Sequence, residues 1–393
     1  MTNLALPRNF VARGFVASGL LLVLFALPTA VRAADPDIPR MQADAQRGSI
    51  RQQIELGAAY FSGRGVPQDE KLAAYWYERA ANAGDPWAQK QMGFFYEAGI
   101  GVQRDPTQAV RWFERAAAGG LVSAKVNLGI AYLLGDGVQK DPALAEKLFH
   151  RAFEQGSGIA ACYLGEMYTG ALGVVSDVAA GEHWYEEGAK RHDPRSQFQL
   201  ATLLWQRQKS VEEPKRAVKL MRESANGGMV AAKHQLAVTL LKHPELGPVK
   251  DAPALLKEAS EAGMWQSSMA LGLVWRDGMA GVKADAKLSY YYYRLAAIQG
   301  GQQALQMINN ELEALSDRLG AEQASAVDRD AQAWFAGHHL FHSFVDKDGG
   351  KHKEYPVYAA KARGPAVYSG PAIPLELSAG FMELPARGRL SAQ

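Results

Sequence analysis

Apolar and polar positions along the chain follow a helical period, and that helical pattern itself recurs. Between residues 50 and 302, each unit predicts an amphipathic helix, a glycine turn and a second amphipathic helix, and successive units start 36 residues apart. The first helix carries Leu-Gly-x-x-Tyr or a looser form of it. Four units keep the glycine and the tyrosine, at Gly57 and Tyr60, Gly93 and Tyr96, Gly129 and Tyr132, and Gly165 and Tyr168. Residues four apart share one helix face, and glycine lets a neighbouring helix approach closely.

The turn between the two helices reads Gly-x-Gly-Val-x-x-Asp. Its aspartate is expected to cap the second helix, at Asp69, Asp105, Asp141 and Asp177. Pro106 and Pro142 then occupy the first helical position, where a missing N–H costs nothing. A glycine-rich phosphate loop is the alternative, but no Lys-Ser/Thr follows the glycines and no strand precedes them. The motif therefore predicts a helix start and no nucleotide site.

The second helix of a unit carries a pair of large residues followed by small ones. Three units have an aromatic pair, at Trp76-Tyr77, Trp112-Phe113 and Trp184-Tyr185, and two weaker units have Leu148-Phe149 and Leu220-Met221. Large and small side chains four apart form a knob and a hole on one stripe, as packing between stacked units requires. We expect these residues in the core.

The pattern predicts an all-α fold, a superhelical solenoid of about seven units over residues 50–302. The fifth and sixth units have lost their paired glycines, which indicates a bend, local softness or a specialised surface. Residues 303–337 predict two helices that cap the last unit. A polar lead-in precedes the array at residues 34–49, and the proline-containing segment 338–393 predicts an extended or disordered tail.

The first 33 residues predict a secretory signal. Arg8 and Arg13 precede the apolar run 19–27, and small residues lead to a cleavage site after Ala33. An uncleaved anchor is the alternative, but the run is short for a membrane span. We therefore expect a periplasmic or secreted protein with no stable membrane span after cleavage. The lone Cys162 excludes an intramolecular disulfide, so the fold must rest on packing.

The overall composition and charge limit the classes of partner that the protein could bind. Apolar residues make up 48% of the chain and charged residues 21%, with a formal net charge of +2. A chain this close to neutral has no strongly basic field for a nucleic acid backbone, so a nucleic acid partner is not expected.

These residues resemble the Sel1-like repeat family, a relative of the tetratricopeptide repeats. The resemblance covers residues 50–336 and is carried by Leu-Gly-x-x-Tyr, Gly-x-Gly-Val-x-x-Asp and Trp-Tyr-x-x-Ala-Ala in register. It implies a right-handed α-solenoid whose first helices line a concave groove, and an adaptor that binds proteins in bacterial envelope assemblies, polysaccharide export or signalling. Cysteine-rich members credited with binding β-lactams form a subclass that the single cysteine excludes.

The motifs of common enzymes are missing from the sequence. It has no Ser-x-x-Lys, Gly-x-Ser-x-Gly or His-Glu-x-x-His, so we expect no enzyme and no cofactor. His338, His339 and His342, with His352, are the best metal candidates, but a solvated histidine-rich helix end is the favoured interpretation and no metal site is predicted.

Binding is the function that remains. The residue after each Leu-Gly pair varies and lies one step from the core stripe, where groove-lining side chains would lie. Beyond Ala58 these candidates are Phe94, Ile130, Glu166, Thr202, Val238 and Leu273. They suit a partner protein or peptide in the groove. Half-buried packing positions are an equal alternative. At the level of function, the alternative to an adaptor is a glycan-binding accessory or regulatory protein of cell-wall or exopolysaccharide metabolism, or a metal-dependent activity of the histidine cluster.

Overall fold

The structure, a computed structural model, describes residues 37–337 apart from 171–176, 208–209 and 211. The described chain is all-α and is built from seven consecutive helix pairs with a further helix at each end. The first helices of the pairs are α2 (Ile50–Ser62), α4 (Pro86–Ala98), α6 (Val122–Leu134), α8 (Gly158–Tyr168), α10 (Pro194–Arg207), α12 (Val230–Lys242) and α14 (Trp265–Asp277). The second helices are α3 (Glu70–Asn82), α5 (Pro106–Ala118), α7 (Pro142–Glu154), α9 (Val178–Lys190), α11 (Glu212–Asn226), α13 (Ala252–Glu261) and α15 (Ala286–Leu319).

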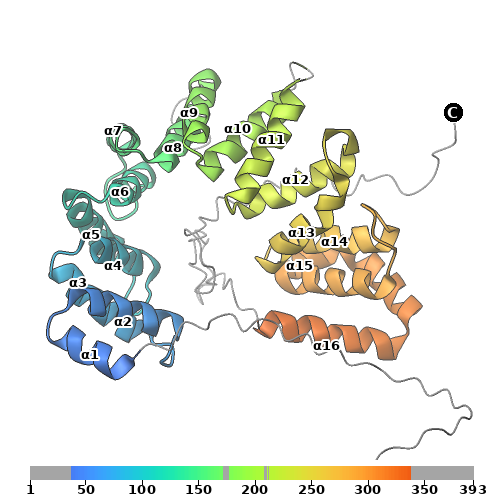
Figure 1. The fold of residues 1–393 in the computed structure, drawn as a ribbon, viewed down its shortest axis with the longest axis horizontal. Helices are drawn as coiled ribbons and strands as arrows, with labels where there is room; N and C mark the ends of the chain where they lie inside the picture. Colours follow the sequence, from blue (N-terminus) through green and yellow to red (C-terminus); the bar gives the residue numbers. More distant parts are fainter. Residues whose placement is uncertain (1–36, 171–176, 208–209, 211, 338–393) are drawn as a thin grey trace, which may run out of the picture.

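Each helix packs on the next helix in the chain, so the pairs stack in sequence order. The stack curves into an open arc, and the N-terminal helices face the C-terminal helices across its opening (Figure 1). In the first four pairs, the first helix lies nearer the inner side of the arc than its partner does (Figure 1). The expected all-α solenoid is confirmed.

The glycine beside each leucine lies against the second large residue of the partner helix. A Cβ added at Gly93 would lie 2.4 Å from the ring of Phe113, and one at Gly165 would lie 2.4 Å from the ring of Tyr185. Gly57, Gly129 and Gly272 meet Tyr77, Phe149 and Tyr293 in the same way. Only glycine allows this approach, because even one methyl group would overlap the ring. These aromatic side chains are buried, as the sequence predicts.

The glycine turns position each pair against the previous one. Asp105 accepts hydrogen bonds from the backbone N–H groups of Thr107 and Gln108, at 3.0 and 3.1 Å. Asp69, Asp141 and Asp177 cap their helices likewise. Gly101 has a positive φ of 64°, and a Cβ there would lie 2.0 Å from the carbonyl oxygen of Glu70 in the preceding pair. The turn is thus both a helix start and an interface between pairs.

Both ends of the array are covered by helices. The expected lead-in contains α1 (Ile38–Gln46), which the sequence analysis does not predict. It forms because Met41 and Ala45 bury themselves against the exposed side of α2, and the Gln53 side chain donates to the Ala45 carbonyl at 3.0 Å. At the other end, Gly301 takes a φ of 57° and bends α15, so that residues 302–319 pair with α16 (Ala321–Gly337).

The sixth pair departs most from the regular pattern. Its turn holds two short 3-10 helices, η1 (Pro244–Leu246) and η2 (Val249–Asp251), in place of a glycine turn. Helix α13 is only 10 residues long and has no side-chain cap at Asp251. No described helix is long and apolar enough to cross a membrane.

Candidate functional site

The structure divides the predicted groove row into two kinds of position. Phe94, Ile130, Thr202 and Leu273 are half-buried, as is Ala58. The side chains of Glu166 and Val238 are buried, with 3% and 5% of their residue surface exposed. Those two therefore lie in the body of the solenoid and offer almost no surface to a partner.

Two exposed apolar side chains continue the helix faces of the half-buried row members on α4 and α6. Trp87 lies seven residues before Phe94 on α4, and Leu134 lies four residues after Ile130 on α6, so each pair shares one helix face. Trp87 is 39% exposed and Leu134 is 48% exposed. Both helices lie on the inner side of the arc (Figure 1). We call Trp87, Phe94, Ile130 and Leu134 the inner apolar patch.

Trp87 is held in place by aromatic and cationic neighbours. Its ring centroid lies 5.7 Å from that of Tyr77, and the Lys90 ammonium lies 6.0 Å from its ring. Burial lowers the pKa of Lys90, since the charged form loses water. An exposed aromatic ring with a fixed orientation is a good anchor for a partner, because little side-chain freedom is lost on binding.

Further along the inner side, a buried ion pair links α8 to α10. Arg195 donates to a Glu166 carboxylate oxygen at 2.6 Å and to the Tyr163 hydroxyl at 3.1 Å. The Gln199 amide donates to the same Glu166 oxygen at 3.3 Å, and the Cys162 thiol donates to it at 3.7 Å. Apolar side chains on α4 and α6 thus give way to a buried ion pair between α8 and α10.

Cys162 has no chemical role that this geometry supports. Its thiol is fully buried, and burial raises its pKa, as does the Glu166 carboxylate beside it. A thiol held protonated and away from solvent is a poor nucleophile. Cys162 is therefore a core residue of the fourth pair.

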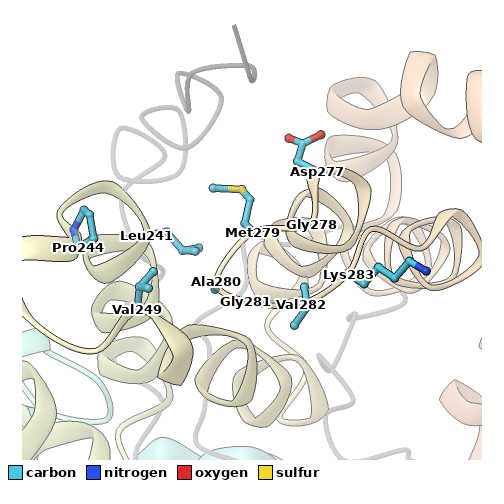
Figure 2. Close-up of a pocket in the computed structure, with 10 residues that line it drawn as sticks. All are labelled: Leu241, Pro244, Val249, Asp277, Gly278, Met279, Ala280, Gly281, Val282 and Lys283. Atoms are coloured by element: carbon cyan, nitrogen blue, oxygen red, sulfur yellow. The ribbon is translucent and has the colours of Figure 1, made fainter. Parts of the chain in front are cut away.

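A pocket opens where the sixth turn faces the seventh. Leu241, Pro244 and Val249 lie on one side, and the turn from Asp277 to Lys283 lies on the other (Figure 2). The enclosed volume is about 640 Å³. Gly281 occupies the place of the packed turn glycines, but no atom lies within 4 Å of a Cβ added there. A second pocket, of about 560 Å³, lies at the regular junction between Gln68–Lys71 and Gly99–Gln103, so an open space at a turn is not confined to the sixth and seventh pairs.

The polar groups of this pocket do not form a catalytic arrangement. The Asp277 carboxylate accepts two hydrogen bonds from Arg276, at 2.8 and 3.0 Å, and Lys283 is exposed and points away in Figure 2. Across residues 37–337, outside the gaps given above, no three His, Cys, Asp or Glu side chains are grouped as metal ligands. The candidate cluster His338, His339, His342 and His352 lies outside the described residues.

The sequence pattern did not identify Trp87 and Leu134, the exposed members of the inner apolar patch. It also did not predict the ion pair between Glu166 and Arg195. A signal for the first was present: Trp87 and Leu134 continue the helix face of Phe94 and Ile130 at spacings of seven and four. No local signal marks the second, because Glu166 and Arg195 are 29 residues apart and meet only when two units stack.

The chain matches the Sel1 repeat family model over more than half of its length, at residues 53–85, 88–121, 122–157, 158–193, 194–229 and 266–301. It therefore belongs to the Sel1 repeat family, whose solenoids generally act as protein–protein interaction scaffolds without catalytic activity. Residues 230–265, which hold the divergent sixth pair, lie between two matched segments. The resemblance inferred from the sequence is thereby confirmed.

Similar solved structures come from several bacteria. A Sel1 repeat protein from Oxalobacter formigenes is 27% identical, with 56% of this chain and 94% of that chain covered and a TM-score of 0.47. A protective antigen of uropathogenic Escherichia coli displaying an SLR fold is 24% identical over 80% and 76% of the two chains, with a TM-score of 0.39. A putative Sel1 repeat protein from Klebsiella pneumoniae is 20% identical over 50% and 96%, with a TM-score of 0.35. No curated protein matches the chain.

Proposed function

We propose that this protein is an exported, non-catalytic scaffold that binds a partner protein or peptide on the inner side of its solenoid. The observation that carries the proposal is the inner apolar patch. Exposed large apolar side chains are uncommon among the described residues. Two of them, Trp87 and Leu134, lie on the same helix faces as the half-buried Phe94 and Ile130. Such clusters on a soluble protein mark contact surfaces.

The patch has the anatomy of a binding hot spot. Its most exposed aromatic residue is a tryptophan, a residue type enriched among those that dominate binding energies when a partner excludes water from them. Gln91 and Asn127 on the same helices carry uncharged amides, and the Lys90 ammonium lies 6.0 Å from the Trp87 ring. Export to the periplasm is part of the proposal and rests on the first 33 residues.

The test is crosslinked capture from the native envelope, with the chain lacking residues 1–33 as bait. The patch variant is Trp87→Ser with Leu134→Ser. The control variant is Leu72→Ser with Tyr75→Ser on α3, because these residues are exposed to the same degree, at 39% and 47%. We expect one protein to be captured by the wild type and the control and to be lost from the patch variant, with all three melting at similar temperatures.

Equal capture by all three proteins would contradict the proposal, and so would equal loss from both variants. Recovery of glycan in place of a protein would favour the accessory role in envelope polysaccharide metabolism. The export step is checked separately, by the mass of the protein in the periplasmic fraction, which should correspond to residues 34–393.

A further inference from the structure

We propose that the partner binds as an extended peptide whose backbone is read by a ladder of side-chain amides. The amides are Gln91 on α4, Asn127 on α6, Gln199 on α10 and Gln235 on α12. We call these four residues the amide ladder. This inference rests on the proposed function, because it names the class of partner that the inner side receives.

The ladder follows from the repeat. Gln91 and Asn127 are 36 residues apart, as are Gln199 and Gln235, so they occupy equivalent positions in their helices. Each lies three residues before a member of the predicted groove row, on the same helix face. In the fourth pair this position is Tyr163, which bonds with Arg195, and the ladder is interrupted there.

Three of the four amides have unused hydrogen-bonding capacity. The side chains of Gln91, Asn127 and Gln235 are half-buried and bond to no other group in the described part of the chain. Gln199 donates to Glu166 and keeps its carbonyl oxygen. A primary amide has two donors and an acceptor, and therefore matches both groups of a peptide backbone.

The spacing fits an extended chain. Neighbouring first helices are separated by about one helix diameter or more, on the order of 10–12 Å with side chains. Three or four residues of extended peptide span that distance at roughly 3.3 Å per residue. One backbone contact per unit would therefore leave two or three residues between contacts, whose side chains reach the inner apolar patch.

A helical partner would make poor use of these groups. The backbone N–H and C=O groups of a helix are bonded within it and are not available to side-chain amides except at its ends. An extended peptide exposes both groups along its whole length. The amide ladder thus favours an extended peptide over an amphipathic helix.

The experiment selects peptides from a displayed library of random 16-residue sequences against the chain lacking residues 1–33. The strongest binder is synthesised and its affinity measured by calorimetry. The ladder variant is Gln91→Met with Asn127→Leu, which keeps side-chain size and removes the amides. The control is Gln108→Met with Asn82→Leu, which makes the same chemical changes on the second helices α5 and α3.

We expect the ladder variant to weaken binding by roughly 3- to 10-fold per amide, the range for one hydrogen bond, and the control to leave it unchanged. Methylation of the peptide's backbone nitrogens one at a time should weaken binding to the wild type at periodic positions and have little effect on the ladder variant. That coupling is specific to backbone recognition.

Equal affinity of the ladder and control variants would overturn the inference. So would a binder whose backbone methylation affects both proteins equally, or the absence of any selected peptide. Each of these results would leave the proposed function intact if the patch variant still fails to capture the protein that the wild type captures. If the patch variant captured it as well as the wild type, the proposed function itself would be overturned.

Discussion

The junction between the first two pairs and the junction between the sixth and seventh perform the same task with different chemistry. In the first, Gly101 places its backbone directly on the start of α3, and an added Cβ would lie 2.0 Å from the Glu70 carbonyl. In the second, a Cβ added at Gly281 would meet no atom within 4 Å, and Gly281 lines the pocket of Figure 2. The stack tolerates one open turn because α13 and α14 still pack together through Leu256, Met269 and their neighbours.

The middle of the array uses a third solution. Between the fourth and fifth pairs, the first helices α8 and α10 are joined by the buried Glu166–Arg195 ion pair. A repeat protein can therefore join neighbouring units by contacts other than a packed glycine turn, because stability requires only that each unit buries a core against the next. Four predictions test how much each kind of junction contributes to stability.

The largest effect is expected from Arg195→Met. It leaves the Glu166 carboxylate buried without its partner, and breaking a buried pair in this way costs about 3–5 kcal/mol. Urea denaturation followed by circular dichroism would measure the loss. The double variant Glu166→Met with Arg195→Met should recover much of it, and a double variant as unstable as the single one would contradict the argument.

Gly101→Ala should destabilise the regular junction by roughly 3 kcal/mol, because it combines a left-handed backbone with a steric clash. Gly281→Ala is the matched control, with a φ of 83° and open space around it, so it bears the backbone strain alone, about 1 kcal/mol. Hydrogen exchange of α3 and α5 would locate the loss. Equal destabilisation by both changes would show that the close approach contributes nothing.

Acid should weaken the junction of the sixth and seventh pairs through His234. Its ring lies 2.9 Å from the Ser267 hydroxyl between α12 and α14, and burial lowers its pKa from 6.5 to about 4. The unfolded chain therefore binds a proton at a pH where the folded chain does not, and stability falls as pH drops from 6.5 towards 4. Between pH 7 and pH 5 the expected loss is about 2 kcal/mol.

The measurement is the urea midpoint of the wild type and of His234→Gln at both pH values. Other titrating groups are present in both proteins, so the difference between them isolates the histidine. The variant should lose about 2 kcal/mol less than the wild type over this interval. Parallel losses would contradict the assignment.

The smallest effect is expected in the open turn. Ala280 has a φ of 54°, in the left-handed region that side chains disfavour, so Ala280→Gly should stabilise the protein by about 0.5 kcal/mol. A rise in melting temperature of one or two degrees would agree with this, as would a similar rise for His192→Gly, whose φ is 57°. A lower melting temperature for both variants would show that the side chains of Ala280 and His192 stabilise the protein more by packing than the backbone strain destabilises it.

Much of the fold could be predicted because its determinants are local and repeated. Leu-Gly-x-x-Tyr fixes the contact of Gly93 with Phe113, and Asp105 fixes the start of α5, within one unit each. Helix α1 was not predicted from the sequence because it is stabilised by packing on α2. Its two buried residues, Met41 and Ala45, form no helical pattern long enough to recognise. Part of the candidate site could also be predicted. Phe94 and Ile130 were identified from their position after the motif, and their contact with a partner stays a prediction.

The helices, the period and the family follow from the sequence, because helix signals lie a few positions apart and the motif recurs at a fixed spacing. Which side chains stay accessible depends on how the units stack in the folded protein. Glu166 and Phe94 occupy equivalent positions in the repeat, yet the first is buried by Arg195 from the next unit and the second is half-buried. The reason is physical: burial depends on neighbours about 30 residues away, and a local pattern contains no information about them.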